Sequence, residues 1–325
     1  MNKLLVTGAP HIKSPVTTTG IMRDVIIALV PALAASALIF GLRSLLVVAV
    51  CVTSCIAFEW LYEKLMKRTS TINDLSAVIT GMLLAYSLPE TIPLWQAIFG
   101  SFIAIVVVKQ LFGGIGKNFA NPALTARIAM FLAFSATMSV FTAIGNDAVS
   151  SATTAISSAT SAGSDAVSSA TPLALIAEGQ LNKLPSLWHM LLGQHGGTLG
   201  ETSALALLLG GLYLIVRRVI TWHTPVCFVA TVFAFTALLG QAPVYQVLSG
   251  GLLLSAIFMA TDYVTSPQTS WGKVVFGIGA GLLTVVFRVY GNYPEGVSFA
   301  ILLMNILTPY ISRMTMPKPL GDVSA

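Results

Sequence analysis

The run RDVIIALVPALAASALIFG, residues 23–41, decides the fold class, because no charged residue follows Asp24 in it. An α-helix needs about 20 mostly apolar residues to cross the ~30 Å hydrocarbon layer, where every backbone polar group has to be paired within the protein. The run therefore predicts a membrane-spanning helix. Other runs of this kind, bounded by charge, proline or glycine, predict an all-α polytopic membrane protein with about ten transmembrane helices. The expected spans are 23–41, 43–62, 75–88, 93–111, 122–141, 203–219, 225–240, 246–262, 271–290 and 298–314.

Composition supports a membrane protein and excludes other classes. Hydrophobic residues make up 55% of the chain and charged residues only 9%, with a mean hydropathy of +0.85, whereas soluble domains carry roughly 25% charged residues. The net charge of +5 comes from basic residues spread singly or in pairs, which excludes a nucleic-acid partner. Cys51, Cys55 and Cys227 lie in apolar runs, which favours buried small hydrophobes over disulfides or a metal site. Since the first twenty residues hold no apolar run of signal-peptide length, we expect the N-terminus to be retained.

The distribution of Lys and Arg predicts the orientation, because cytoplasmic loops of membrane proteins carry the excess of these residues. With the N-terminus inside, thirteen of them fall on the cytoplasmic side and three on the other, while Arg127 lies within the fifth span. We therefore expect both termini in the cytoplasm and loop 142–202 outside. The thirteen are Lys3, Lys13, Arg23, Lys64, Lys67, Arg68, Lys109, Lys117, Arg217, Arg218, Lys273, Arg313 and Lys318, and the three are Arg43, Lys183 and Arg288.

Two stretches suggest an internal repeat. WQAIFGSFIAIVVVKQLFGG, which begins at Trp95, is similar to WGKVVFGIGAGLLTVVFRVYGN, which begins at Trp271. If the repeating unit has five spans, an odd number, its second copy enters the membrane from the opposite face, and the pathway is expected at the interface of the halves. The expected division is a cytoplasmic segment 1–22, a first five-helix half 23–141, an external loop 142–202, a second five-helix half 203–314 and a cytoplasmic tail 315–325.

Ionisable residues in or beside the spans are candidates for function, because a charge there costs at least ~2.5–3.5 kcal/mol on insertion scales. Five residues qualify: Asp24, Asp74, Arg127, Asp262 and Arg288. All lie near the ends of expected helices, where interfacial water can satisfy them, so structural anchoring is the alternative for each. Asp262 is the first candidate for an ion path, because the glycine-rich stretch before it permits close helix approach. Asp74, at the start of the short third span, is the second.

Loop 142–202 contains Ser-Ser-Ala-Thr three times, ending at Thr153, Thr160 and Thr171. The Ser, Ala, Thr and Gly of residues 147–164 are typical of a flexible, solvent-exposed linker. Only the third copy is followed by proline and an apolar run, PLALI, which can dock against membrane or protein. Proline also biases the residue before it toward an extended backbone. Thr171 is therefore the threonine expected on an ordered edge.

The run DAVSSATPL, residues 165–173, resembles the flavinylation sequence of a family that includes the D subunit of the Rnf complex and the related B subunit of the sodium-translocating NADH:quinone oxidoreductase. Further segments resemble the Rnf branch, which the chain length and the short N-terminal segment also favour. The duplicated tract before Thr171 departs from the family pattern. The segments are APHIKSP at 9–15, IMRDVIIALVPAL at 21–33, GGIGKNFANPALTAR at 113–127 and FMATDYVTSP at 258–267.

The resemblance implies a phosphoester between FMN and the oxygen of Thr171, installed by a flavin transferase. It also implies a bacterial inner-membrane electron carrier, in a complex that couples electron transfer between ferredoxin and NAD to Na+ or H+ translocation. Its partners would be the other membrane and peripheral subunits, and a second, unbound flavin such as riboflavin is implied as well. Such a translocase subunit needs no catalytic side chain, since the redox chemistry belongs to the flavin. The flavin-site residues implied around Thr171 are Asp165, Ser168, Ser169, Ala170 and Pro172.

Two other classes fit the same pattern of spans. A flavin-free channel or secondary transporter also uses inverted five-helix repeats and glycine-rich spans, and a structural scaffold subunit would lack a flavin too. Covalently bound flavin distinguishes the electron carrier from both alternatives, because neither of them carries it.

Overall fold

The computed structural model describes residues 17–141, 171–180, 182, 184–193, 195–201, 203–291, 293 and 296–317. These residues form helices and no strand, which confirms the all-α prediction for this part of the chain. The repeated tract lies outside the described residues up to position 170. Six residues considered in the sequence analysis therefore lie outside the described residues: Thr153, Thr160, Asp165, Ser168, Ser169 and Ala170.

Four helices of the described residues are long and apolar enough to cross a membrane. They are α1 (Thr18–Phe40) and α2 (Leu42–Leu65) near the N-terminus, and α14 (Ser270–Val289) and α15 (Val297–Thr315) near the C-terminus. Gly41, with φ 74°, joins α1 to α2. Many large apolar side chains on these helices stay exposed, among them Leu38 at 88%, as expected for surfaces that face lipid or another membrane subunit.

Helices occupy all ten expected regions, but in the other six regions the helices described have fewer than 18 residues. Span 122–141 was predicted too long, because the helix stops at Ala133 and Phe134 leaves helical geometry with φ −134°. Span 246–262 is not one helix, because it is interrupted at Gly250 and Gly251. The shorter elements are α3 (Ser76–Tyr86), α4 (Leu94–Phe102) with its π-helical continuation η2 (Ile103–Gln110), α5 (Pro122–Ala133), α6 (Ser135–Met138), α10 (Ala204–Val216), α11 (His223–Leu238), α12 (Pro243–Leu248), α13 (Leu252–Leu254) and the π-helix η4 (Ser255–Met259).

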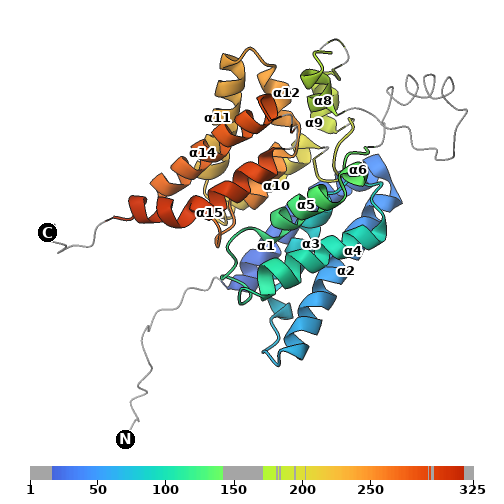
Figure 1. Ribbon diagram of the computed structural model, residues 1–325, viewed down its shortest axis with the longest axis vertical. Helices are drawn as coiled ribbons and strands as arrows, with labels where there is room; N and C mark the ends of the chain where they lie inside the picture. The colour runs from blue at the N-terminus through green and yellow to red at the C-terminus, as the bar shows by residue number, and fades with distance from the viewer. Residues whose placement is uncertain are drawn as a thin grey trace, which may run out of the picture.

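The helices form two groups, α1 to α6 and α10 to α15, that pack side by side (Figure 1). The first group surrounds α3, whose residues are nearly all buried. Glycine lets the helices come close: a Cβ on Gly81 would lie 2.7 Å from the backbone of Val52 in α2, and one on Gly210 in α10 would lie 2.2 Å from the carbonyl oxygen of Ala28 in α1. Small residues serve this purpose at helix contacts in membranes. The α1–α10 contact joins the two groups.

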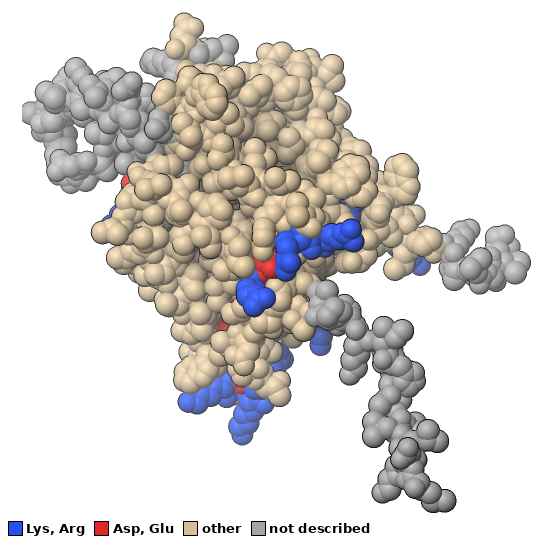
Figure 2. Space-filling model, turned by 180° about the vertical axis from the view of Figure 1, so that it is seen from behind, with Lys and Arg blue, Asp and Glu red and all other residues tan. Residues whose placement is uncertain are grey.

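Charged residues are distributed unevenly over the molecule. The face shown in Figure 2 is mostly uncharged, with one group of Lys and Arg near its middle and another at its lower end. The C-terminal end of α2 contributes Lys64, Lys67 and Arg68, all exposed. Two short helices, α8 (Pro172–Ala177) and α9 (Leu187–Leu192), lie beside α12 toward the opposite end of the molecule (Figure 1).

Candidate functional site

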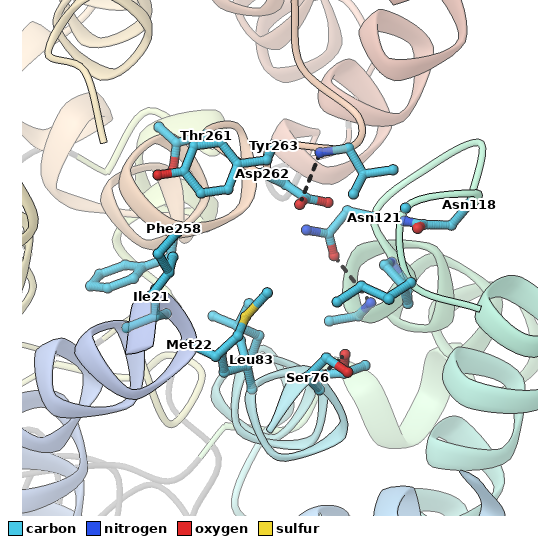
Figure 3. A pocket seen from close by; sticks show the side chains of 18 of the residues that line it. Ile21, Met22, Ser76, Leu83, Asn118, Asn121, Phe258, Thr261, Asp262 and Tyr263 are labelled. Atoms are coloured by element: carbon cyan, nitrogen blue, oxygen red, sulfur yellow. Dashed lines mark hydrogen bonds between the residues drawn. The ribbon is translucent and has the colours of Figure 1, made fainter. Parts of the chain in front are cut away.

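A cavity of about 340 Å³ lies where the two groups of helices meet (Figure 3). Its first wall comes from α1 and the start of α3, and its second from the end of α10 and the segment that follows η4. Apolar side chains form most of the lining, and polar ones gather near the start of α3 and of α5. Ligand pockets commonly combine apolar walls with a few polar groups. The lining includes Ile21, Met22, Leu83, Phe258, Ser76, Lys109, Asn118, Asn121, Thr261 and Asp262.

The polar part of the cavity includes the residues that begin α5. Asn121 caps this helix, since its Oδ1 accepts from the backbone N–H of Ala123 (3.1 Å) and of Leu124 (3.3 Å). Pro122 occupies the first turn, where its missing N–H costs nothing. The Asn118 amide donates to the Ala120 carbonyl at 3.0 Å. The two asparagines therefore stabilise the turn and also line the cavity.

Asp262 lines the same cavity, just after η4. Its carboxylate accepts from the backbone N–H of Val264 (3.4 Å) and from the hydroxyl of Thr265 (3.2 Å). Thr308 of α15 in turn donates to the Thr265 carbonyl at 2.8 Å. Asp262 therefore stabilises a turn that is anchored to α15, and it faces the space between the two helix groups (Figure 3).

A buried ion pair borders the cavity on the side of the first helix group. The Lys109 ammonium lies 2.7 Å from Glu59 Oε1 and 2.9 Å from Oε2, with 3% and 0% of the two side chains exposed. Lys109 also donates to the Ser76 hydroxyl at 2.6 Å, and its neighbour Gln110 donates to Glu59 at 2.9 Å. Both donors come from the π-helix η2, a rare geometry that occurs frequently at functional sites.

This pair is connected to two further carboxylates. The Asp74 carboxylate accepts from the backbone N–H of Ser76 (2.9 Å) and from its hydroxyl, so Asp74 reaches Lys109 through Ser76. On the other side, the Thr71 hydroxyl contacts Glu59 (3.1 Å) and Glu63, while the Thr71 backbone N–H donates to Glu63 at 3.0 Å. We call Glu59, Glu63, Thr71, Asp74, Ser76, Lys109 and Gln110 the α2 polar network.

Sequence reasoning identified only Asp74 of this network as a site residue. The sequence places Lys109 among the cations of the cytoplasmic side, whereas its side chain is buried in the protein. The missed signal was Glu59, a carboxylate inside the expected span 43–62. It continues the row of Cys51 and Cys55 at four-residue spacing, with Glu63 next, and all four residues are buried. The structure thus brings Asp74 and Asp262 to the same cavity, with Asp74 reaching it through Ser76.

The second candidate site is the segment that begins at Thr171. Thr171 has φ −66° and ψ 152°, the extended backbone expected before a proline. Its hydroxyl accepts from the Ala174 N–H at 3.3 Å and so caps α8. Pro172, Leu173 and Ile176 are buried, so the apolar run docks against protein, as the sequence predicted.

Known proteins are similar to this chain over nearly its whole length. Residues 5–321 match the model of the NQR2, RnfD, RnfE family. The D subunit of the Na(+)-translocating ferredoxin:NAD(+) oxidoreductase complex from Acetobacterium woodii is 45% identical, over 98% of this chain and 95% of its own. The D subunit of a proton-translocating ferredoxin:NAD(+) oxidoreductase complex from Clostridium ljungdahlii is 36% identical, over 98% and 97%. The D subunit of an ion-translocating oxidoreductase complex from Stutzerimonas stutzeri is 38% identical, over 93% and 91%.

Proposed function

The chain belongs to the NQR2, RnfD, RnfE family, and from this premise we propose that it is a membrane electron-carrier subunit with FMN attached covalently to Thr171. It works in a complex that couples electron transfer between ferredoxin and NAD to the translocation of Na+ or H+. The other subunits of that complex, and a flavin transferase during maturation, are its partners. The flavin supplies one-electron redox chemistry, and this chain holds the flavin and provides the ion path.

The surroundings of Thr171 support the attachment. The threonine stands at the start of a helix whose apolar side chains are buried against the protein, while Thr171 itself is only half-buried. Within the described part of the chain its hydroxyl makes one long hydrogen bond, which it accepts from the Ala174 N–H at 3.3 Å. A hydroxyl in this position remains reachable for a transferase, and the docked helix then keeps the attached group near the membrane helices.

The intact mass of the purified subunit, produced with its flavin transferase, tests the proposal. We expect the mass of the chain plus one FMN joined as a phosphoester, and a band that fluoresces under ultraviolet light on a denaturing gel. An unmodified mass and a dark band would instead favour a flavin-free channel, transporter or scaffold.

In this proposal the second, unbound flavin, such as riboflavin, occupies the cavity between the helix groups. The cavity volume of about 340 Å³ falls within the range of ligand pockets, roughly 300 to 1,000 Å³. Apolar walls that include Met22 and Phe258 suit the faces of a flat ring, and Ser76, Asn118 and Asn121 suit its polar edge.

The proposed topology has ten spans in two inverted halves, with both termini in the cytoplasm of a bacterium and the chain in its inner membrane. A short helix and an interrupted one support the inverted halves, because α3 and the α12–α13–η4 region occupy corresponding third positions, and α3 and η4 line the same cavity. Discontinuous helices at the interface of inverted repeats are typical of membrane transport proteins.

Single cysteines introduced at two exposed positions test this orientation. Met66 lies just after α2 and Gln180 just after α8, and both are exposed. We expect a membrane-impermeant maleimide added outside the cell to label Gln180→Cys and to miss Met66→Cys until the membrane is opened. The reverse pattern would overturn the orientation together with an external site at Thr171.

The ion path in this proposal passes Asp262 and Asp74. Replacing Asp262 by Asn retains the shape of the side chain and removes its charge, and we expect ion transport per electron to fall at least tenfold while covalent flavin is retained. Transport measured in proteoliposomes against NAD reduction checks this. Thr308→Val, which removes one hydrogen bond between α15 and the Asp262 turn but keeps the carboxylate, is the matched control. Normal coupling in an assembled Asp262→Asn complex would remove this residue from the path.

A further inference from the structure

Two consecutive glycines interrupt the eighth helical region. Gly250 and Gly251 have φ of 69° and 64°, a left-handed backbone that residues with a Cβ rarely adopt. They separate α12 from α13, and Ser249 before them is extended. A helix that ends in this way leaves its last carbonyl groups without helical partners.

The guanidinium of Arg288 satisfies one of these carbonyl groups and two more in the break that follows α12. Arg288 is in the last turn of α14 and is 8% exposed. Its Nη2 donates to the carbonyls of Ser249 (2.9 Å) and Gly250 (3.3 Å), and its Nη1 donates to the carbonyl and side-chain oxygens of Gln246. A planar group with several fixed donors can bridge such a set, whereas a lysine ammonium cannot reach all of them.

The same contact includes α8. A Cβ placed on Gly250 would lie 2.4 Å from Arg288 Nη2 and 2.4 Å from Leu173 Cδ1, so the two side chains meet over this glycine. Leu173 is two residues after Thr171. The first turn of α8 therefore packs, through Leu173, against Gly250, whose backbone Arg288 binds.

A second arginine comes from the other helix group. Arg127 of α5 is 3% exposed, and its Nη1 donates to the Ser298 hydroxyl at 3.2 Å. The same nitrogen lies 3.4 Å from the position of a Cβ on Gly251. Each half of the molecule thus places one guanidinium beside the glycine pair, next to the segment that begins at Thr171.

We propose that Arg288 is a positioning residue of the external flavin site, which holds α8 on the glycine break and keeps a positive charge beside the segment that carries Thr171. The role of the positive charge rests on the proposed attachment of FMN to Thr171. A nearby cation in a site of low dielectric stabilises whichever redox state carries more negative charge, so Arg288 raises the reduction potential of the attached flavin.

The docking of α8 can be measured without any flavin. Ile176 is 9% exposed on α8, and Ile176→Cys in a Cys227→Ser background reports its accessibility. We expect Arg288→Met to raise the rate of maleimide labelling at this cysteine at least tenfold and Arg288→Lys to raise it less. Arg217→Met is the control, because Arg217 pairs with Asp24 at 3.0 Å on another part of the surface and is 53% exposed. Unchanged labelling in both Arg288 variants would overturn the positioning role.

The charge is tested on flavin-loaded protein by redox titration. We expect Arg288→Met to lower the equilibrium constant for one-electron reduction about tenfold, which corresponds to a 59 mV lower potential, and Arg288→Lys to keep most of the wild-type value. A reduction potential that stays constant in a flavin-loaded Arg288→Met protein would overturn the electrostatic role.

If Arg288→Met does not assemble, a wild-type rate of maleimide labelling in Arg288→Lys still contradicts the positioning role. If the wild-type chain carries no covalent flavin, the proposed function fails, while labelling still decides the positioning role.

Discussion

Thr171→Val is expected to abolish covalent flavin completely, because valine has nearly the shape of threonine but no oxygen to esterify. The structure predicts that the loss is chemical rather than a failure to fold. Thr171 caps a helix of only six residues through one hydrogen bond of 3.3 Å, and loss of such a cap costs about 1 kcal/mol. The docked residues Leu173 and Ile176 are unchanged. In-gel fluorescence and intact mass, with the transferase present, measure the result.

The repeated tract provides the controls for this experiment. Thr153 and Thr160 end the same four letters, Ser-Ser-Ala-Thr, but neither is followed by proline and an apolar run. We expect Thr153→Val and Thr160→Val to retain full fluorescence. Thr171→Asn, which keeps an oxygen able to cap α8 but has no hydroxyl to esterify, separates loss of the acceptor from loss of the cap. A fluorescent Thr171→Val band, or a dark band in either other variant alone, would contradict attachment at Thr171.

The sequence was sufficient for those features that depend on local composition. Apolar runs predicted helices in the correct regions, Pro172 predicted the extended backbone of Thr171, and the short third span was found as α3. Apolar content does not reveal where a helix stops within a run. The breaks at Phe134 and at Gly250 depend on packing: Phe134 packs edge-on against Trp95 and Phe99, and Gly250 must accommodate Arg288 and Leu173.

The candidate site was harder to predict, because its partners are distant in sequence. Glu59 and Lys109 are 50 residues apart, and each alone resembles an interfacial residue at the end of a span. The four-residue spacing of Cys51, Cys55, Glu59 and Glu63 indicates one helix face, yet nothing in the sequence says what that face contacts. Asp74 and Asp262 were selected from the sequence as separate residues, and only the fold brings Ser76 and Asp262 to one cavity.

The α2 polar network leads to a second large effect, the destabilisation caused by breaking the Glu59–Lys109 pair. Lys109→Met removes the only cation that the structure shows, among the described residues, within 4.0 Å of Glu59. Glu59 is fully buried, and leaving one member of a buried ion pair without its partner costs about 3–5 kcal/mol. Gln110 and Thr71 still donate to the carboxylate, but neither supplies a compensating charge. We expect a large drop in the thermal unfolding midpoint of the purified subunit.

Restoring neutrality should reverse most of this loss. In the double variant Glu59→Gln, Lys109→Met no charge of the pair remains, and replacing a buried ion pair by uncharged groups is often neutral or stabilising. We therefore expect the double variant to unfold near the wild-type temperature and Lys109→Met alone far below it. Arg217→Met breaks an ion pair whose arginine is 53% exposed, and we expect it to change the thermal unfolding midpoint little, because solvent already screens such pairs.

If the double variant were as unstable as Lys109→Met, packing of the lysine side chain rather than its charge would stabilise this part of the protein. A double variant that is stable and loaded with flavin but cannot couple electron flow to ion transport would extend the proposed ion path from Asp74 to Glu59 and Lys109.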